Sequence, residues 1–317
     1  MNFRTLQVFV EVVRQGGFSR AAETVFATQS TVSKAVRHLE DEVGVPLIDR
    51  TGHRSTLTAA GEVVYRRALR LLAERDDLMA EIDEIRGLTR GTLRLGLPPI
   101  GSSQLFAPAL AAYRARYPGI AVQLVEHGST RLEEVLRAGE IDLAGSLLPV
   151  ADEFDWQPVR REPLVALLAR GHPLADAGPI AIDALRDTPF ILFEGGFALN
   201  RIILEACRRR GFEPQIAVRS SQVDFIVELA AAGMGAAFLP RLMAEEQRRH
   251  GVGQALLDHA DTDWNMAMVW RRNAYLSHAA RAWLACLPKA DAGTVDAVHG
   301  RVGGDGRGVT KPAGSIT

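Results

Sequence analysis

The sequence predicts an α/β protein in which a small helical domain with a β-wing precedes one long helix and a larger domain of alternating strands and helices. Three observations predict this class. Short helical patterns fill the first 58 residues, and one long helical pattern without proline runs from residue 59 to about 88. Beyond residue 90, short β-rich runs alternate with amphipathic helical stretches. A chain of 317 residues is long enough for two or three domains, each with its own core.

The composition is that of an ordinary globular protein with almost no net charge. The formal net charge is −1, so no global positive field attracts nucleic acid, and any DNA contact must come from locally placed cations. No stretch approaches the ~20 apolar residues that span a bilayer, and the N-terminus lacks a signal-peptide pattern. We therefore expect a cytoplasmic protein without membrane contact.

The two cysteines, Cys207 and Cys286, lie far apart in the sequence and outside any metal-ligand spacing. This usage fits a reducing compartment and no disulfide framework, and a redox-sensing pair is the alternative. We expect neither a metal nor another cofactor.

The N-terminal residues predict three closely spaced helices. Gly16 and Gly17 end the first helix, and Ser19 is the predicted N-cap of the second. The third is predicted from Gln29 to about Val43. The apolar face of the first helix consists of Leu6, Phe9, Val10 and Val13.

The third helix divides into an apolar stripe and a polar side. At about 100° per residue, the stripe consists of Val32, Val36, Leu39 and Val43. Short hydrogen-bonding groups and two cations occupy the other side, where they are free to contact base edges or phosphates in a major groove. A solvated face on an ordinary amphipathic helix is the alternative, which the preceding helices and the following hairpin disfavour.

Two short strand candidates, Leu47-Ile48 and Leu57-Thr58, flank a polar turn that contains Gly52. This pattern predicts a β-wing. Arg50 and Arg54 would lie at its base and tip, where guanidinium groups hold phosphates or enter a minor groove. As solvated turn charges, the two arginines would have no role.

The run from Phe18 to Gly61, FSRAAETVFATQSTVSKAVRHLEDEVGVPLIDRTGHRSTLTAAG, resembles the N-terminal signature of LysR-type transcriptional regulators. Residue identities and spacing both match over this stretch, and the remaining architecture agrees out to about residue 289. One departure is Ser30, where the family often has proline. This difference bears on which bases the helix would prefer, and not on whether it binds DNA. The DNA contacts that the resemblance implies are Gln29, Ser30, Thr31, Ser33, Lys34 and Arg37, with Arg50 and Arg54 in support.

The long helix carries a heptad-like seam. The seam positions are Val64, Ala68, Leu71, Arg75, Leu78, Ile82 and Ile85. Alternating steps of four and three residues are typical of a coiled coil that pairs two copies of one chain. A dimer would place two recognition helices in successive major grooves. A helix packed on its own chain is the alternative.

Beyond residue 90, the first unit predicts strands at Thr92–Leu97, Ala121–Glu126 and Asp142–Leu147 in a parallel sheet covered by helices. Ligands bind beyond the carboxyl ends of such strands, where helix N-termini favour anions. Plain N-capping is the alternative for any single serine or threonine there. The residues expected at these ends are Pro99, Gly101, Ser102, Ser103, Ser129 and Thr130.

A second unit predicts further short, buried runs typical of parallel strands, at Leu164–Ala169, Phe190–Phe193, Ile216–Ser220 and Ala236–Leu239. Two glycine-rich turns are expected to border the cleft between the units. They and the preceding strand end add Phe193, Glu194, Gly195 and Met234 to the expected ligand set. The strand Asn265–Arg271 and the helix Ala279–Leu287 are expected to return to the first unit.

The resemblance implies the remaining organisation. It predicts a winged helix-turn-helix (1–58), a dimerising linker helix (59–89), an effector-binding domain (90–289) and a disordered tail (290–317). The effector domain is expected to be periplasmic-binding-protein-like, with two Rossmann-like subdomains, I at about 90–162 and 265–289 and II at about 163–264. Expected partners are double-stranded operator DNA, a small effector such as an organic acid, further copies in a dimer and tetramer, and RNA polymerase.

No catalytic constellation is visible in the sequence. Nucleophile-elbow, zinc-protease and Cys/His metal motifs are all missing, and nothing pairs in sequence with His127, the one candidate base. We therefore expect an effector-gated transcription regulator and not an enzyme. A small-molecule receptor and a DNA-tethered enzyme are the alternatives.

Overall fold

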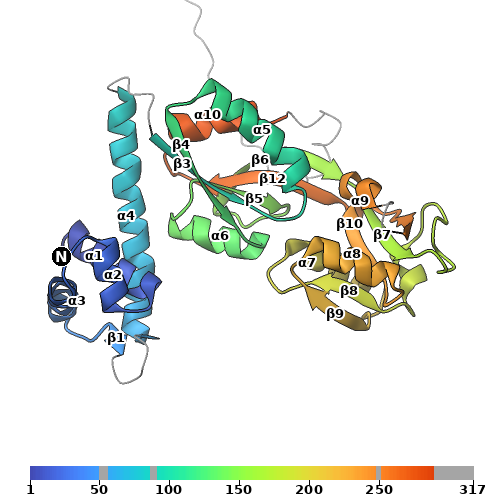
Figure 1. Cartoon of the computed structure of the whole chain (residues 1–317), viewed down its shortest axis with the longest axis horizontal. Helices are drawn as coiled ribbons and strands as arrows, with labels where there is room; N and C mark the ends of the chain where they lie inside the picture. The colour runs from blue at the N-terminus through green and yellow to red at the C-terminus, as the bar shows by residue number, and fades with distance from the viewer. Residues whose placement is uncertain (50–55, 86–90, 248–250, 289–317) are drawn as a thin grey trace, which may run out of the picture.

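In a computed structural model, a helical N-terminal domain, one long helix and two α/β subdomains follow one another across the molecule (Figure 1). The structure describes residues 1–49, 56–85, 91–247 and 251–288. Among these residues, no helix has the length and apolar character needed to cross a lipid bilayer.

Three helices and a two-stranded wing make up the N-terminal domain. They are α1 (Phe3–Gln15), α2 (Phe18–Thr24), α3 (Gln29–Val43), β1 (Ile48–Asp49) and β2 (Thr56–Leu57). The strands pair antiparallel, with Ile48 opposite Leu57, as predicted for the wing. The first three residues of the predicted α1 face are buried in the domain core, and Val13 packs against that core.

Two expectations for this domain are wrong. Ser19 is not an N-cap, because α2 begins one residue earlier, after Gly17. Val43 does not complete the buried stripe of α3 and keeps 39% of its surface exposed. It lies in the last turn, directly before the helix ends at Gly44.

Helix α4 (Ala59–Ile85) runs along the N-terminal domain and beyond it (Figure 1). The predicted seam is divided between two environments. Ala68 is buried in the N-terminal core and Val64 packs against it, so this part of the helix packs on its own chain. Leu71 and Leu78 are 43% and 57% exposed. Only the seam beyond Ala68 is therefore open to a partner.

Subdomain I is built on one five-stranded sheet in the order β4-β3-β5-β12-β6. Its strands are β3 (Gly91–Leu97), β4 (Ile120–Glu126), β5 (Leu143–Leu147), β6 (Phe154–Glu162) and β12 (Trp264–Arg271). Its helices are α5 (Ser102–Arg116), α6 (Ser129–Ala138) and α10 (His278–Cys286). The first three strands are parallel as predicted. Strand β12 is antiparallel to β5 and β6 because the chain returns from subdomain II alongside the strand by which it left.

Subdomain II joins an antiparallel sheet, β10-β7-β11, to the parallel pair β8-β9. Its strands are β7 (Leu164–Ala169), β8 (Phe190–Phe193), β9 (Ile216–Ser220), β10 (Ala237–Pro240) and β11 (Val252–Leu256). Its helices are α7 (Ala198–Arg209), α8 (Val223–Ala231) and α9 (Arg241–Gln247), with short 3₁₀ turns η1 (Ile182–Leu185) and η3 (Ala260–Thr262). The expectation of parallel strands is therefore wrong for β7 and β10, and β11 was not among the predicted strands. Full burial of a strand reports that both faces of the sheet are covered, and it does not report strand direction.

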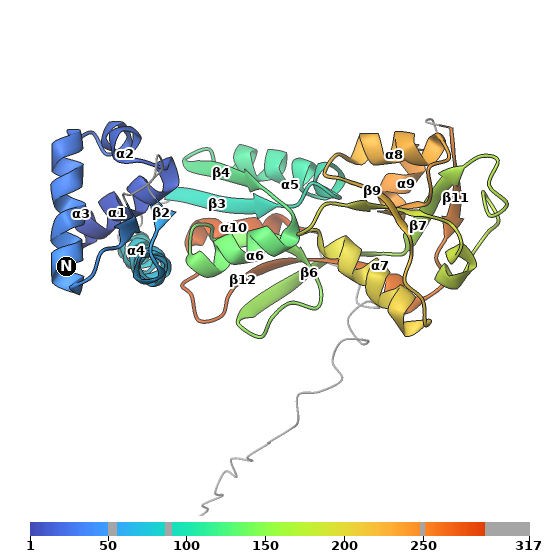
Figure 2. The same ribbon diagram turned by 90° about the horizontal axis from the view of Figure 1, so that it is seen from below.

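The two subdomains share one hydrophobic core, subdomain I has a second cluster around α6, and the N-terminal domain has a core of its own. Figure 2 shows the N-terminal helices at one end, subdomain II at the other, and subdomain I between them. Subdomain I is therefore the part of the chain through which the two ends are connected.

Candidate nucleic-acid interface and ligand site

Helix α3 rests on the N-terminal core through Val32, Val36 and Leu39, none of which is exposed. Thr28 begins the helix by accepting a hydrogen bond from the Thr31 N–H, and the left-handed Gly44 ends it. The predicted contact residues Gln29, Ser30, Thr31, Lys34 and Arg37 are exposed, and Ser33 is half-buried. The polar side of the helix therefore faces solvent, which is what a groove-reading helix requires.

Charges are segregated along α3. Lys34 and Arg37, near the middle of the helix, form no ion pair with any residue that the structure describes. The acidic residues lie in its second half, where Glu42 pairs with the N-terminal amino group at 2.5 Å. The helix dipole adds positive potential at the N-terminal end, on the far side of the cations from these carboxylates. The N-terminal half of α3 is thus the half suited to phosphate.

The wing is held against α3 by Glu40, a residue that sequence reasoning missed. Its Oε1 accepts hydrogen bonds from the N–H groups of Leu47 at 2.9 Å and Ile48 at 3.2 Å. A carboxylate that satisfies two backbone donors of another element fixes where that element begins. Arg50 and Arg54 lie outside the described residues.

The expected ligand residues of subdomain I lie at the carboxyl ends of β3 and β4, which are paired in register up to Leu97 and Glu126. Helices α5 and α6 begin after Gly101 and Gly128, and neither N-cap makes a side-chain hydrogen bond to its helix. The alternative of plain N-capping therefore does not hold for these serines and threonines. Both helices present first-turn N–H groups without a side-chain cap.

The hydroxyl side chains at these helix starts differ in exposure and in their hydrogen-bond partners. Ser102 donates to the Pro98 carbonyl, while the exposed Ser103 bonds only the neighbouring Gln104 side chain at 2.8 Å. Ser129 is buried, and Thr130 and Pro99 are exposed. Of the four hydroxyls, those of Ser103 and Thr130 are the most accessible to a ligand.

Subdomains I and II touch directly at this edge of the sheet. The Thr130 N–H donates to the Gly196 carbonyl at 3.1 Å. A Cβ atom on Gly128 would lie 2.6 Å from that same carbonyl oxygen, so only glycine permits the approach. Phe193 is buried while Glu194 and Gly195 are exposed beside this contact. The structure thus brings the loops after β4 and β8 together.

Buried Asn200 organises the loop after β8. Its side-chain amide donates to the carbonyls of Phe193 and Glu194 at 2.8 and 3.0 Å, and its oxygen accepts from the Phe193 N–H at 3.1 Å. On the other side, buried Ser146 donates to the Glu133 carboxylate at 2.5 Å. Sequence analysis did not predict a role for these residues. The one signal available was Asn200, an amide side chain on the buried face of α7.

Met234 does not join this set. Ala236 forms a parallel bridge to Phe190, the first residue of β8, and Gly235 packs against the carbonyl of Pro189. The loop that carries Met234 therefore lies at the start of β8, at the opposite end from Phe193. Both glycine-rich turns were expected to border the cleft between the units, but one follows β8 and the other lies beside its first residue.

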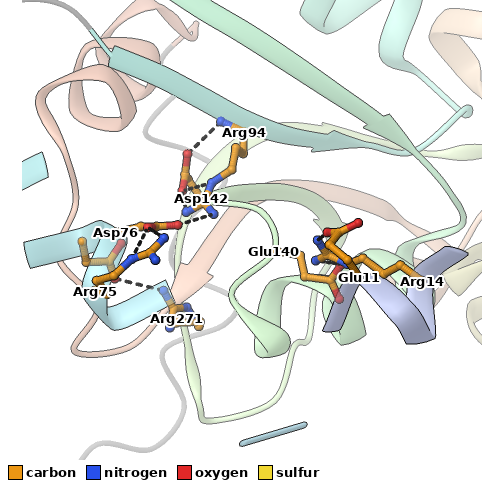
Figure 3. Close-up of polar contacts among 9 residues, drawn as sticks. Glu11, Arg14, Arg75, Asp76, Arg94, Glu140, Asp142 and Arg271 are labelled. Carbon is orange, nitrogen blue, oxygen red and sulfur yellow. Dashed lines mark hydrogen bonds and ion pairs between the residues drawn. The ribbon is translucent and has the colours of Figure 1, made fainter. Parts of the chain in front are cut away.

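A polar junction joins subdomain I to the N-terminal half of the chain (Figure 3). Arg14 of α1 pairs with Glu140 at 2.8 Å, and Arg271 of β12 pairs with Asp77 of α4 at 3.1 Å. Arg94 pairs with Asp142 at 2.6 Å, and its guanidinium also lies 4.0 Å from Asp76. Burial raises the pKa of Asp77, with Arg271 opposing that shift. A cavity of about 390 Å³ adjoins these side chains.

Helix α6 connects the two regions. It begins at Ser129, beside the subdomain contact, and is followed at its other end by Gly139, where an added Cβ would overlap the Cβ of Ala73 on α4. Ala138 packs against the N-terminal core. Ten residues of α-helix, about 15 Å long, thus span the distance from the candidate ligand site to the linker helix.

The remaining candidate groups are the two cysteines and any cluster of metal-ligating side chains. Burial raises the pKa of the Cys207 thiol to about 11, so it stays protonated at neutral pH. Cys286 ends α10 in subdomain I, whereas Cys207 lies on α7 in subdomain II. The described residues hold no group of three or more His, Cys, Asp or Glu side chains placed for a metal ion.

Comparison with known proteins identifies the two halves separately. Residues 3–62 match the bacterial regulatory helix-turn-helix proteins of the lysR family, and residues 86–292 match the LysR substrate binding domain. The chain belongs to the LysR family. It is 34% identical over 285 residues to YwbI, an uncharacterized HTH-type transcriptional regulator of Bacillus subtilis (strain 168), covering 90% of this chain and 95% of the relative.

Two further similarities agree with this assignment. YcgK of Bacillus subtilis (strain 168), also an uncharacterized HTH-type transcriptional regulator, is 31% identical over 304 residues, with 90% of this chain and 93% of YcgK covered. A full-length OxyR variant of Pseudomonas aeruginosa superposes with a TM-score of 0.72 at 23% identity, with 90% of this chain and 94% of that chain covered. At that identity the likeness concerns the fold alone.

The LysR family assignment confirms the predicted function class. The chain is a DNA-binding transcriptional regulator with an effector-binding domain, in a family of regulators and not of enzymes. The receptor and DNA-tethered-enzyme alternatives are therefore set aside.

Proposed function

We propose that this regulator binds operator DNA as a dimer or tetramer in the cytoplasm, reading the groove with Gln29 to Arg37 of α3. A small organic acid, bound where subdomains I and II meet, adjusts the spacing of the recognition helices, and RNA polymerase responds to the bound complex. The observation that carries the proposal is the exposure of the polar side of α3 while its apolar stripe is buried. Helices of this kind enter the major groove.

For DNA contact, we expect Arg37→Ala to weaken binding about tenfold without unfolding the domain, because a lost base or phosphate contact costs about 1–3 kcal/mol. Fluorescence anisotropy against a duplex selected from a random library, repeated over a salt series, measures this. Arg170→Ala, which removes an exposed arginine of subdomain II, is the matched control. Unchanged affinity in the salt series, with unchanged circular dichroism, contradicts the role of Arg37.

For the ligand, the support is the pair of helix N-termini without side-chain caps at one sheet edge. A carboxylate there accepts backbone N–H groups and is stabilised by both helix dipoles. Ser103 and Thr130 add exposed hydroxyls. The Gly196 carbonyl already occupies the Thr130 N–H, so a ligand that takes this N–H must displace it and change the subdomain contact.

We expect a thermal-shift screen of small organic acids to find one that raises the melting temperature by several degrees, since saturation at 100 times Kd adds about 2.7 kcal/mol. Ser103→Ala removes one charge-assisted hydrogen bond, worth about 1.5 kcal/mol, and raises Kd about tenfold. Thr92→Ala, at the opposite end of the same sheet, is the control. A shift that Ser103→Ala leaves unchanged places the ligand elsewhere.

For self-association, the support is the exposure of Leu71 and Leu78, which are seven residues apart on α4. This spacing places them on one stripe of the helix, and an exposed apolar stripe at heptad spacing is stabilised by pairing with a second copy. Pairing through α4 also carries two copies of α3 into one complex.

For coupling, we propose that α6 transmits the state of the ligand site to α4. The support is that one end of α6 bonds Gly196 through Thr130, while Gly139 at the other end packs on Ala73. Packed helices move as rigid bodies. A shift of α6 at Thr130 would therefore also shift its contact with the linker helix α4.

A further inference from the structure

The turn between α2 and α3 presents an aromatic ring to solvent. Phe26 is 98% exposed, more than any other large apolar side chain of the described residues. A groove of about 450 Å³ lies beside the turn, lined in part by Val8, Val25 and Phe26 itself, yet the ring is not buried in it. Transferring an aromatic ring from water to an apolar contact is favourable. A ring this exposed in a short turn would therefore be stabilised by contact with a partner molecule.

The backbone at Phe26 is also in a conformation that disfavours phenylalanine. Its φ of +51° lies in the left-handed region, which costs every residue except glycine and, to a lesser degree, asparagine. The Phe26 N–H bonds the Glu23 carbonyl and the Ala27 N–H bonds the Ala22 carbonyl. This pair of bonds is a Schellman helix end, whose left-handed position is usually glycine. Phenylalanine therefore contributes nothing to the turn itself.

The position of the ring indicates the partner. Phe26 stands two residues before Thr28, the N-cap of α3, and is followed by the exposed Gln29, Ser30 and Thr31. It is therefore continuous with the N-terminal end of α3, where the helix dipole is positive. Lys34 and Arg37 lie about one and two turns further along the helix. A second protein would have to approach the same end of α3 that faces DNA.

We propose that Phe26 is a DNA contact, and that its ring packs on apolar atoms of the duplex at the entrance to the major groove. Duplex DNA offers two such surfaces there, the thymine 5-methyl group and the deoxyribose carbons. The proposal rests on the DNA binding of α3 and adds an apolar element to an interface otherwise made of polar and basic groups.

The test uses the full-length protein and a duplex that the wild type selects from a random library. Phe26→Gly removes the ring and relaxes the left-handed turn, so its melting temperature should be no lower than that of the wild type. Affinity in fluorescence anisotropy should nevertheless fall about tenfold, the loss expected for one base-edge contact. Phe26→Tyr keeps a ring and should keep most of the affinity, whereas Phe225→Ala, which removes an exposed ring of subdomain II, should change nothing.

The same duplex with deoxyuracil in place of thymine distinguishes the two surfaces. If the ring touches a thymine methyl, the wild type loses affinity for the deoxyuracil duplex and Phe26→Gly does not. If the ring touches deoxyribose, both proteins treat the two duplexes alike while the tenfold difference between them remains. Either pattern supports the contact. Wild-type affinity in Phe26→Gly overturns it and leaves the ring to a protein partner, whereas failure of the wild type to select any duplex counts against the reading of DNA by α3.

Discussion

Replacing Leu71 and Leu78 together by aspartate is expected to separate the proposed dimer into monomers and to lower operator affinity by on the order of 100-fold or more. Both side chains are exposed on α4, and neither belongs to a hydrophobic core of its own chain. In a coiled-coil seam, two aspartates per helix would place four negative charges face to face in a desolvated interface, which opposes pairing strongly. Each monomer then binds a single half-site, and the gain from linking two half-sites is lost.

Sedimentation at micromolar concentration measures the mass, and anisotropy with the selected duplex measures the affinity. Leu71→Met with Leu78→Met keeps the stripe apolar and should retain both the mass and the affinity. Circular dichroism should be the same for both double variants, because the N-terminal core is built from other residues. A wild-type chain that sediments as a monomer, or an aspartate variant of wild-type mass, is incompatible with pairing through this stripe.

Local patterns predicted most of the elements correctly. Helix α3 has the predicted bounds, and β7, β8 and β9 occupy the predicted residues. These elements are set by short-range features, namely helical periodicity, capping residues and runs of apolar residues. The exposure of the polar side of α3 followed from the same periodicity, since burying the stripe of Val32, Val36 and Leu39 turns the opposite face to solvent.

The predictions that were wrong concern features that depend on contacts between residues far apart in the sequence. The direction of β7 and β10 in subdomain II is set by how distant parts of the chain pair, which no local pattern encodes. Met234 was misplaced for the same reason. The residues that were missed, such as Glu40 and Asn200, hold backbone groups of neighbouring loops, and their polar side chains have no distinctive spacing. The pair Arg14–Glu140 joins residues 126 positions apart.

Gly139→Ala is expected to abolish the response of DNA binding to the ligand while leaving ligand binding itself in place. The added Cβ would lie less than 3.0 Å from the Cβ of Ala73, and carbon atoms do not approach this closely, so α6 and α4 must separate. Gly139 also has a φ of +79°, where alanine costs roughly 1–2 kcal/mol in any context. Gly211→Ala isolates this second cost, because Gly211 has a φ of +72° and open space around it.

Hydrogen exchange in α4 and α6 reports the contact, and anisotropy with and without the organic acid that stabilises the wild type reports the response. In Gly139→Ala the amides of both helices should exchange faster and the acid should no longer change operator affinity, although it still raises the melting temperature. Gly211→Ala should keep the response despite its backbone cost. Adding Ala73→Gly to Gly139→Ala removes the opposing carbon and should restore the response. If Gly139→Ala responds to the acid as the wild type does, α6 is not the connection, and the signal must pass through the Arg271–Asp77 and Arg94–Asp76 pairs that join the same two halves.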